Sequence, residues 1–78
     1  MNGDCWLYGT RIGVFGIVSL NGGWHVFYED EDLGRYQTPG LALDDLAGGH
    51  TYSPSSGVDT STLGLPEDLS EWEFRAAR

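Results

Sequence analysis

Short apolar runs alternate with glycine-containing turn signals in the N-terminal half of the chain, a pattern typical of an antiparallel sheet. The clearest unit spans residues 14–28, where two runs rich in β-branched and aromatic residues flank Asn21, Gly22 and Gly23. Asn-Gly is the strongest short hairpin signal, because both turn residues must adopt a positive φ. We therefore expect a β-hairpin at this position.

The segments on either side of this hairpin predict further strands. An acidic run over residues 29–34 predicts a second turn, and residues 35–38 can pair back before Pro39 removes a backbone donor. The run Cys-Trp-Leu-Tyr at residues 5–8 is a candidate first strand, although its pairing partner does not follow from the pattern. The N-terminal half is therefore predicted to form a β-meander.

A short helix is predicted over residues 41–47, because apolar side chains recur at Leu43, Leu46 and Ala47 among good helix formers. Two glycines directly after it supply a stop signal. The following residues 50–64 are rich in Ser, Thr, Gly, Pro and Asp, so we expect a long irregular loop.

The C-terminal segment fits two secondary structures. As a helix, it has Pro66 at the first position, acidic residues near its N-terminus and arginines near its C-terminus. As a strand over residues 71–75, it places Trp72 and Phe74 on one face, and this is the interpretation we favour. The prediction is one α+β domain, residues 1–78: an antiparallel meander of about four to five strands with one short helix.

The charge composition of the chain limits the kinds of partner that we expect. The chain has 78 residues, with 12 acidic residues against four arginines and no lysine, a formal net charge of −8 and a pI near 4.2. The four arginines are scattered along the chain rather than clustered. Because phosphate backbones and acidic membrane surfaces attract proteins chiefly through Lys and Arg, we expect neither direct nucleic-acid binding nor membrane binding. The absence of lysine is compatible with coding bias, the interpretation we favour, and with adaptation to high salt.

Size and cysteine content add further expectations. A domain of this length buries only about 60% of the surface of its unfolded chain, so a large multi-part active site is not expected. The single cysteine, Cys5, excludes an intramolecular disulfide and favours a reducing compartment. The first residues resemble no secretory leader, and no apolar run is long enough to span a membrane. The sequence therefore predicts a soluble cytoplasmic protein.

Four consecutive acidic residues form the densest charge in the chain: Glu29, Asp30, Glu31 and Asp32. Four carboxylates suggest a site for Ca²⁺ or Mg²⁺, but an EF-hand register starting at Glu29 places Leu33 at a ligand position and Gly40 at the last one. The remaining interpretations are a solvated turn and a recognition patch for a basic partner.

Other chemical motifs are missing or incomplete. Cys5, His25 and His50 stand alone, whereas structural zinc sites use four ligands in short pairs, and no nucleophile elbow accompanies a Cys-His pair. The glycines do not form a dinucleotide fingerprint, and a phosphate-binding P-loop requires a lysine. We expect no enzyme activity, no metal and no cofactor.

Aromatic residues suggest an interaction surface. Alternation along residues 24–28 places Trp24, Val26 and Tyr28 on one face of a strand, with His25 and Phe27 on the other. In so small a domain, the helix and the C-terminal segment can cover only one of these faces. The other face is then a candidate interaction surface.

These observations predict a small noncatalytic protein-binding module or inhibitor, in which an acidic hairpin steers association and aromatic residues supply affinity. The expected contact residues are Glu29, Asp30, Glu31, Asp32, Trp24 and Phe27. One version is a mimic of nucleic acid, in which Asp44 and Asp45 join the acidic run as substitutes for phosphates. The alternative is a homodimer formed through a sheet edge or the exposed aromatic face.

Overall fold

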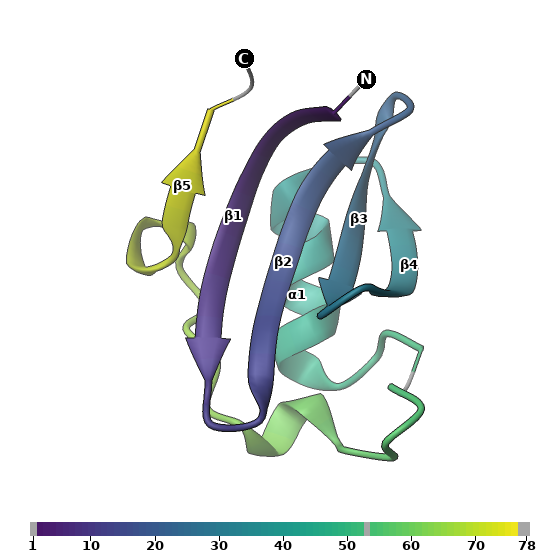
Figure 1. Ribbon diagram of the computed structural model, residues 1–78, viewed down its shortest axis with the longest axis vertical. Helices are drawn as coiled ribbons and strands as arrows, with labels where there is room; N and C mark the ends of the chain where they lie inside the picture. The colour runs from purple at the N-terminus through teal and green to yellow at the C-terminus, as the bar shows by residue number, and fades with distance from the viewer. Residues whose placement is uncertain (1, 53, 77–78) are drawn as a thin grey trace.

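A computed structural model describes residues 2–52 and 54–76, which form a five-stranded antiparallel sheet with one helix packed on one face (Figure 1). The elements are β1 (Asn2–Thr10), β2 (Gly13–Leu20), β3 (Gly23–Tyr28), β4 (Glu31–Tyr36), α1 (Pro39–Gly48), two 3₁₀ turns η1 (Thr60–Thr62) and η2 (Leu69–Glu71), and β5 (Glu73–Arg75). The strand order is β4-β3-β2-β1-β5. This confirms the predicted α+β meander.

The hairpin between β2 and β3 forms as predicted. Asn21 and Gly22 adopt φ values of 53° and 79°, so both turn residues lie in the left-handed region that an Asn-Gly turn requires. This turn sets the register in which Val18 pairs with His25 and Gly16 with Phe27. The hairpin therefore places residues from the two central strands side by side.

The predicted second turn is wrong in length. Only Glu29 and Asp30 form it, whereas Glu31 and Asp32 already belong to β4. Glu29 adopts a φ of 55°, its amide donates to the Val14 carbonyl at 2.8 Å, and its carboxylate accepts from the Val14 amide at 2.5 Å. These bonds hold a two-residue turn, so the acidic residues after it can pair with β3. Charged residues are common on an edge strand such as β4.

A bulge in β4 decides which of its side chains reach the core. Val26 pairs with Gly34 and Phe27 with Asp32, so Leu33 is an extra residue between two successive pairs. Gly34 has a φ of 144°, a backbone conformation that residues other than glycine rarely adopt. The bulge lets Leu33, which is 1% exposed, face the core while Asp32 faces away from it.

The strand β1, whose partner the sequence left open, pairs with both β2 and β5. The C-terminal segment is a strand over residues 73–75, so the favoured interpretation is confirmed there, although Glu71 belongs to η2. Phe74 pairs with Trp6, and the Trp72 ring contacts the Tyr8 ring at 5.5 Å. Both C-terminal aromatic residues therefore contact inward-facing residues of β1.

The helix α1 begins two residues earlier and ends one residue later than predicted. Thr38 caps it by accepting a hydrogen bond from the Leu41 amide, and Pro39 occupies the first turn, where a missing N–H costs nothing. Gly49 ends it in the left-handed conformation with a φ of 79°. In the loop after it, the described residues 50–52 and 54–64 are irregular as predicted, except for η1, and Ser53 lies outside the described residues.

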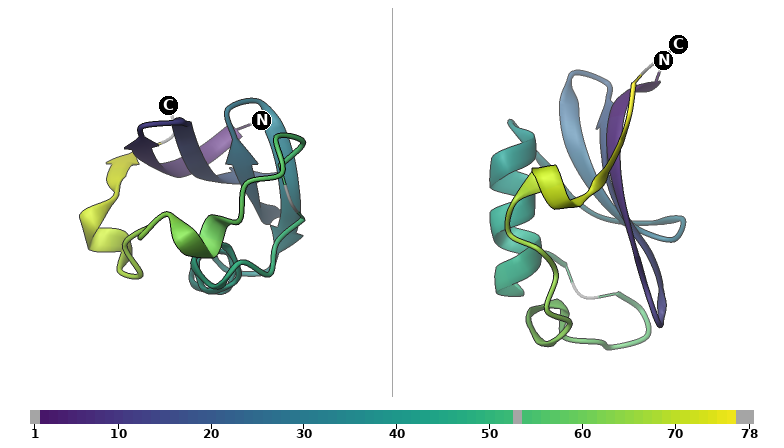
Figure 2. Two further views of the ribbon diagram at one scale, coloured as in Figure 1. Left: turned by 90° about the horizontal axis from the view of Figure 1, so that it is seen from below. Right: turned by 90° about the vertical axis from the view of Figure 1, so that its left-hand side faces the viewer.

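The core lies between the sheet and a second layer formed by residues 37–52 and 54–72. Figure 2 shows this layer, which comprises α1, both 3₁₀ turns and their connections, on a single side of the sheet. The buried apolar residues are Phe15, Ile17, Val26, Leu33, Ala42, Leu43, Leu46, Leu65 and Trp72. We call the covered side of the sheet the inner face and the opposite side the outer face. No helix of the described chain is both long and apolar enough to cross a membrane.

Candidate functional site

The outer face is the surface that the fold leaves without a covering layer. Ile17 and Val26 pair with each other, are fully buried and mark the inner face, so their neighbours along each strand point outward. In the right-hand view of Figure 2, α1 and the connecting segments lie on one side of the sheet, and no described element lies on the other. The outer face is therefore available to a partner.

Strand pairing arranges the outer-face residues in two rows that run across all five strands. One row, which we call the arginine-ended row, consists of Arg75, Cys5, Val18, His25 and Arg35 in the order β5, β1, β2, β3, β4. The other, the acid-ended row, consists of Glu73, Leu7, Gly16, Phe27 and Asp32 in the same order. Each row therefore has an apolar middle and charged ends.

The middle of the two rows is partly exposed and continuous. Leu7, Val18 and Phe27 are half-buried, as expected for side chains that have neighbouring strands beside them but no layer above them. Gly16 is buried beneath its neighbours, because a Cβ atom built on it would lie 3.2 Å from the Leu7 Cδ2 atom. Val14, 43% exposed, extends the apolar surface along β2.

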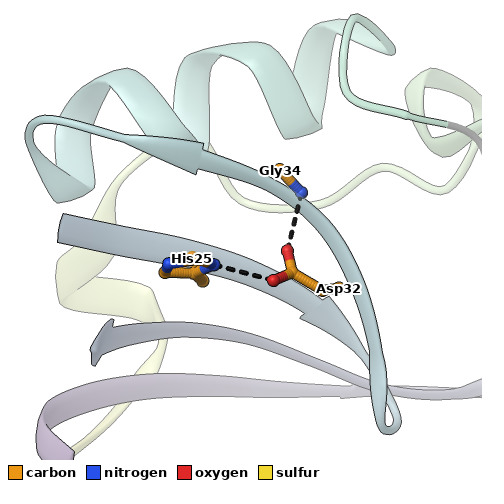
Figure 3. Close-up of polar contacts among 3 residues, drawn as sticks. All are labelled: His25, Asp32 and Gly34. Carbon is orange, nitrogen blue, oxygen red and sulfur yellow. Dashed lines mark hydrogen bonds and ion pairs between the residues drawn. The ribbon is translucent and has the colours of Figure 1, made fainter. Parts of the chain in front are cut away.

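A hydrogen-bonded His-Asp pair lies at the β4 end of the outer face. His25 Nδ1 is 2.8 Å from Asp32 Oδ2, and Asp32 Oδ1 accepts a hydrogen bond from the Gly34 amide at 2.9 Å (Figure 3). The Asp32 carboxylate thus connects the β4 bulge to the imidazole on β3. The His25 ring also stacks on Phe27, with 6.2 Å between ring centres. The hydrogen bond to Asp32 and the stacking on Phe27 together fix the orientation of the His25 ring.

An ion pair lies at the β5 end. Arg75 Nη2 is 2.9 Å from Glu73 Oε2, and both side chains are exposed. The two ends of the outer face therefore carry two arginines and two carboxylates, together with His25. Its charge is close to balanced, although the whole chain carries −8.

The two predicted aromatic contact residues lie on opposite faces. Phe27 is on the outer face, whereas Trp24 is on the inner face, where its ring contacts Trp6 at 5.4 Å. Phe74, 49% exposed, contacts the other side of Trp6 at 4.9 Å. His25 lies opposite Trp24 and Val26, as the alternation predicted. The structure does not bring Trp24 and Phe27 into one contact surface.

The four acidic residues of the predicted hairpin patch point to different parts of the molecule. The Glu29 carboxylate binds the Val14 amide, and that of Glu31 accepts from the Ser55 amide and hydroxyl on the irregular loop. The Asp32 carboxylate turns to His25 on the outer face, and Asp30 is exposed in the turn. Three of the four carboxylates therefore hold neighbouring segments of this chain in place.

Negative charge is concentrated in the layer on the inner side. Residues 37–72 contain Asp44, Asp45, Asp59, Glu67, Asp68 and Glu71 and no arginine. Hydrogen bonds from the Ser61 hydroxyl and amide lower the pKa of Asp59, and those from the Ser70 amide and hydroxyl lower the pKa of Asp68. Both carboxylates cap 3₁₀ turns and remain charged at neutral pH.

Cys5 and His25 share the arginine-ended row, but Val18 on β2 lies between them. Cys5 is half-buried, and His50 is exposed beyond the C-terminus of α1. Within residues 2–52 and 54–76, no three His, Cys, Asp or Glu side chains gather closely enough to hold a metal ion.

No protein-family model matches this chain, and neither the curated proteins nor the solved structures contain a match to it. The physical properties of the outer face are therefore the basis for a functional proposal. Sequence patterning identified Phe27 and His25 on this face. It missed Leu7, Val18, Arg35, Glu73 and Arg75, because alternation assigns a residue to a face without saying which residues of other strands lie beside it.

Proposed function

We propose that this protein acts by binding a second protein molecule, of its own or another kind, through its outer sheet face. The proposal is supported by the two rows of the outer face. Together they form an apolar surface on the central strands, with charged residues on β4 and β5. Binding interfaces commonly combine an apolar, aromatic centre with a polar rim. Phe27 and Val18 provide the centre, and the polar side-chain pairs at the β4 and β5 ends provide the rim.

A photoreactive phenylalanine analogue at position 27 tests this proposal. The matched control carries the same analogue in place of Leu41, which is 51% exposed on α1, on the other side of the molecule. After irradiation in cells that express the protein, the position-27 variant is expected to form a covalent adduct with a protein, and the position-41 variant is not. Absence of an adduct at position 27, or equal yields at both positions, would refute the proposed site.

A second candidate function uses the acidic layer. Six carboxylates and no arginine in residues 37–72 favour attraction of a basic partner, and mimicry of nucleic acid is one version of this function. Replacing Asp44, Glu67 and Glu71 with their amides would then weaken capture by a nucleic-acid-binding enzyme. Such binding should also weaken as salt concentration rises. Unchanged affinity in the amide variant would exclude the acidic layer as the binding surface.

A further inference from the structure

Neighbouring positions on the outer face carry opposite charges at both of its ends. On β4, Arg35 of the arginine-ended row lies three residues from Asp32 of the acid-ended row. On β5, Arg75 and Glu73 lie two residues apart. The two ends match, so one row has positive ends and the other has negative ends.

This arrangement makes the outer face complementary to itself. A two-fold axis that runs across the strands, midway between the rows, places each row of one subunit over the other row of its partner. Arg35 then faces the partner subunit's Asp32, and Arg75 faces the partner subunit's Glu73. At the centre of the sheet, Val18 lies over the partner subunit's Gly16, which neighbouring Leu7 and Val18 side chains cover, so the apolar centres of the two faces meet there.

From these relationships we infer that the occupant of the outer face is a second copy of this chain, bound face to face about such an axis. The inference rests on the proposed function and names its partner. A five-stranded face about 24 Å wide and about 20 Å long gives roughly 500 Å² per subunit. The resulting total of roughly 1,000 Å² reaches the lower end of specific protein interfaces.

The distribution of charge favours this pairing over pairing through the other layer. Association through residues 37–72 would bring two acidic layers together, and no arginine in that segment would offset their repulsion. Face-to-face sheet packing instead leaves the acidic layers on the outer surfaces of the dimer. Each subunit is about 20 Å thick, so these layers are separated by more than the Debye length of about 8 Å at physiological salt.

Sedimentation of the full chain over a range of concentrations tests the inference directly. The expected result is a concentration-dependent species of twice the 8.5 kDa chain mass. Val18→Asp puts a charge at the centre of the interface and is expected to yield monomers, whereas Leu41→Asp, with the same added charge on α1, is expected to leave the dimer unchanged. A wild-type chain that stays monomeric at about millimolar concentration would overturn the inference, because weaker association falls outside the usual range for specific complexes.

Exchanging the charges on β5 tests whether each row lies over the other row of the partner subunit. The two exchanged residues, Glu73 and Arg75, are exposed and lie outside the core. Glu73→Arg and Arg75→Glu are each expected to weaken dimerisation roughly tenfold, because each creates two like-charge contacts related by the two-fold axis. The double variant is expected to restore the wild-type dissociation constant to within about threefold. Single variants that dimerise as well as the wild type, or a double variant as weak as the singles, would overturn the arrangement. Thermal unfolding of each variant verifies that its fold is retained.

The crosslinking experiment separates failure of this inference from failure of the proposed function. An adduct at position 27 that contains two copies of this chain supports both. An adduct with a different protein, together with a monomeric wild type, supports the proposed function and overturns the second-copy inference. Absence of any adduct overturns both.

Discussion

The hydroxyl of Thr60 donates a hydrogen bond to the carbonyl oxygen of Leu46 at 2.7 Å, and this bond is buried. Leu46 lies in the last turn of α1, where helix carbonyls have no partner within the helix. Thr60 begins η1 and is only 3% exposed. A side chain from the irregular loop thus joins the loop to the end of the helix.

Thr60→Val keeps the size and branching of this side chain but removes its donor. The variant should lower the free energy of unfolding by about 0.5–1.5 kcal/mol, because the Leu46 carbonyl loses one of its two donors and keeps the Gly49 amide at 3.2 Å. Urea denaturation measures the change, with Thr60→Ser as the control, since serine retains the hydroxyl. Equal stability of the valine variant and the wild type would show that the bond contributes nothing.

Alkaline pH should destabilise the fold through Tyr36. Burial, followed by a hydrogen bond and charge repulsion from Asp45, raises the pKa of Tyr36 from 10.0 to about 12. A group whose pKa is higher in the folded state stabilises that state below its unfolded pKa, and this contribution is lost as pH rises. The free energy of unfolding should therefore fall between pH 10 and about pH 12.

Asp45→Asn removes the carboxylate charge beside Tyr36, so the pKa of Tyr36 should move back toward 10.0. Ultraviolet titration of tyrosinate measures this pKa, and Asp44→Asn on the same helix serves as the control. A Tyr36 titration that does not change in the Asp45 variant would assign the raised pKa to burial and to the charge of Tyr52.

The hairpin turn should be sensitive to Gly22→Ala. A Cβ atom at this position meets no atom within 4 Å, so its cost comes from the backbone φ of 79° alone. That cost should be about 1–2 kcal/mol in the free energy of unfolding. Gly9→Ala is the matched control, because its Cβ also meets nothing and its φ lies outside the left-handed region. If both variants lose equal stability, backbone strain is not the cause.

The pairing of His25 with Asp32 should be energetically modest. The two side chains are 16% and 45% exposed, and partly solvated pairs contribute about 0.2–1 kcal/mol. A double-mutant cycle with His25→Gln and Asp32→Asn measures their coupling energy by chemical denaturation. The amide oxygen introduced by Asp32→Asn can still accept from the Gly34 amide, so the cycle isolates the contact with His25. A coupling energy of several kcal/mol would contradict this expectation.

The local features of the fold were readable from the sequence. Asn21 and Gly22 specify a turn through their own backbone preferences, and the two glycines after the predicted helix specify its end in the same way. Alternation assigned Trp24 and Phe27 to opposite faces, because successive side chains of a strand point in opposite directions. Each of these properties depends on residues that are close together in the chain.

The candidate site was predictable only in part. Alternation places Phe27 on the correct strand, whereas the acidic run that follows it predicts a single loop patch. Glu31 instead reaches Ser55, and Asp32 reaches His25, because β4 pairs with β3 directly after Glu29 and Asp30. The direction of a carboxylate depends on which donor the fold brings near it, and composition does not contain that information.

The turns, the end of the helix, the alternation of faces and the overall acidity follow from the order of the amino acids. Tertiary structure alone decided that β1 lies between β2 and β5, that a bulge turns Leu33 into the core and that the two charged rows cross the outer face in matching order. The physical reason is that turns and caps are satisfied by neighbouring residues. The register of distant strands depends on which surfaces can be buried together.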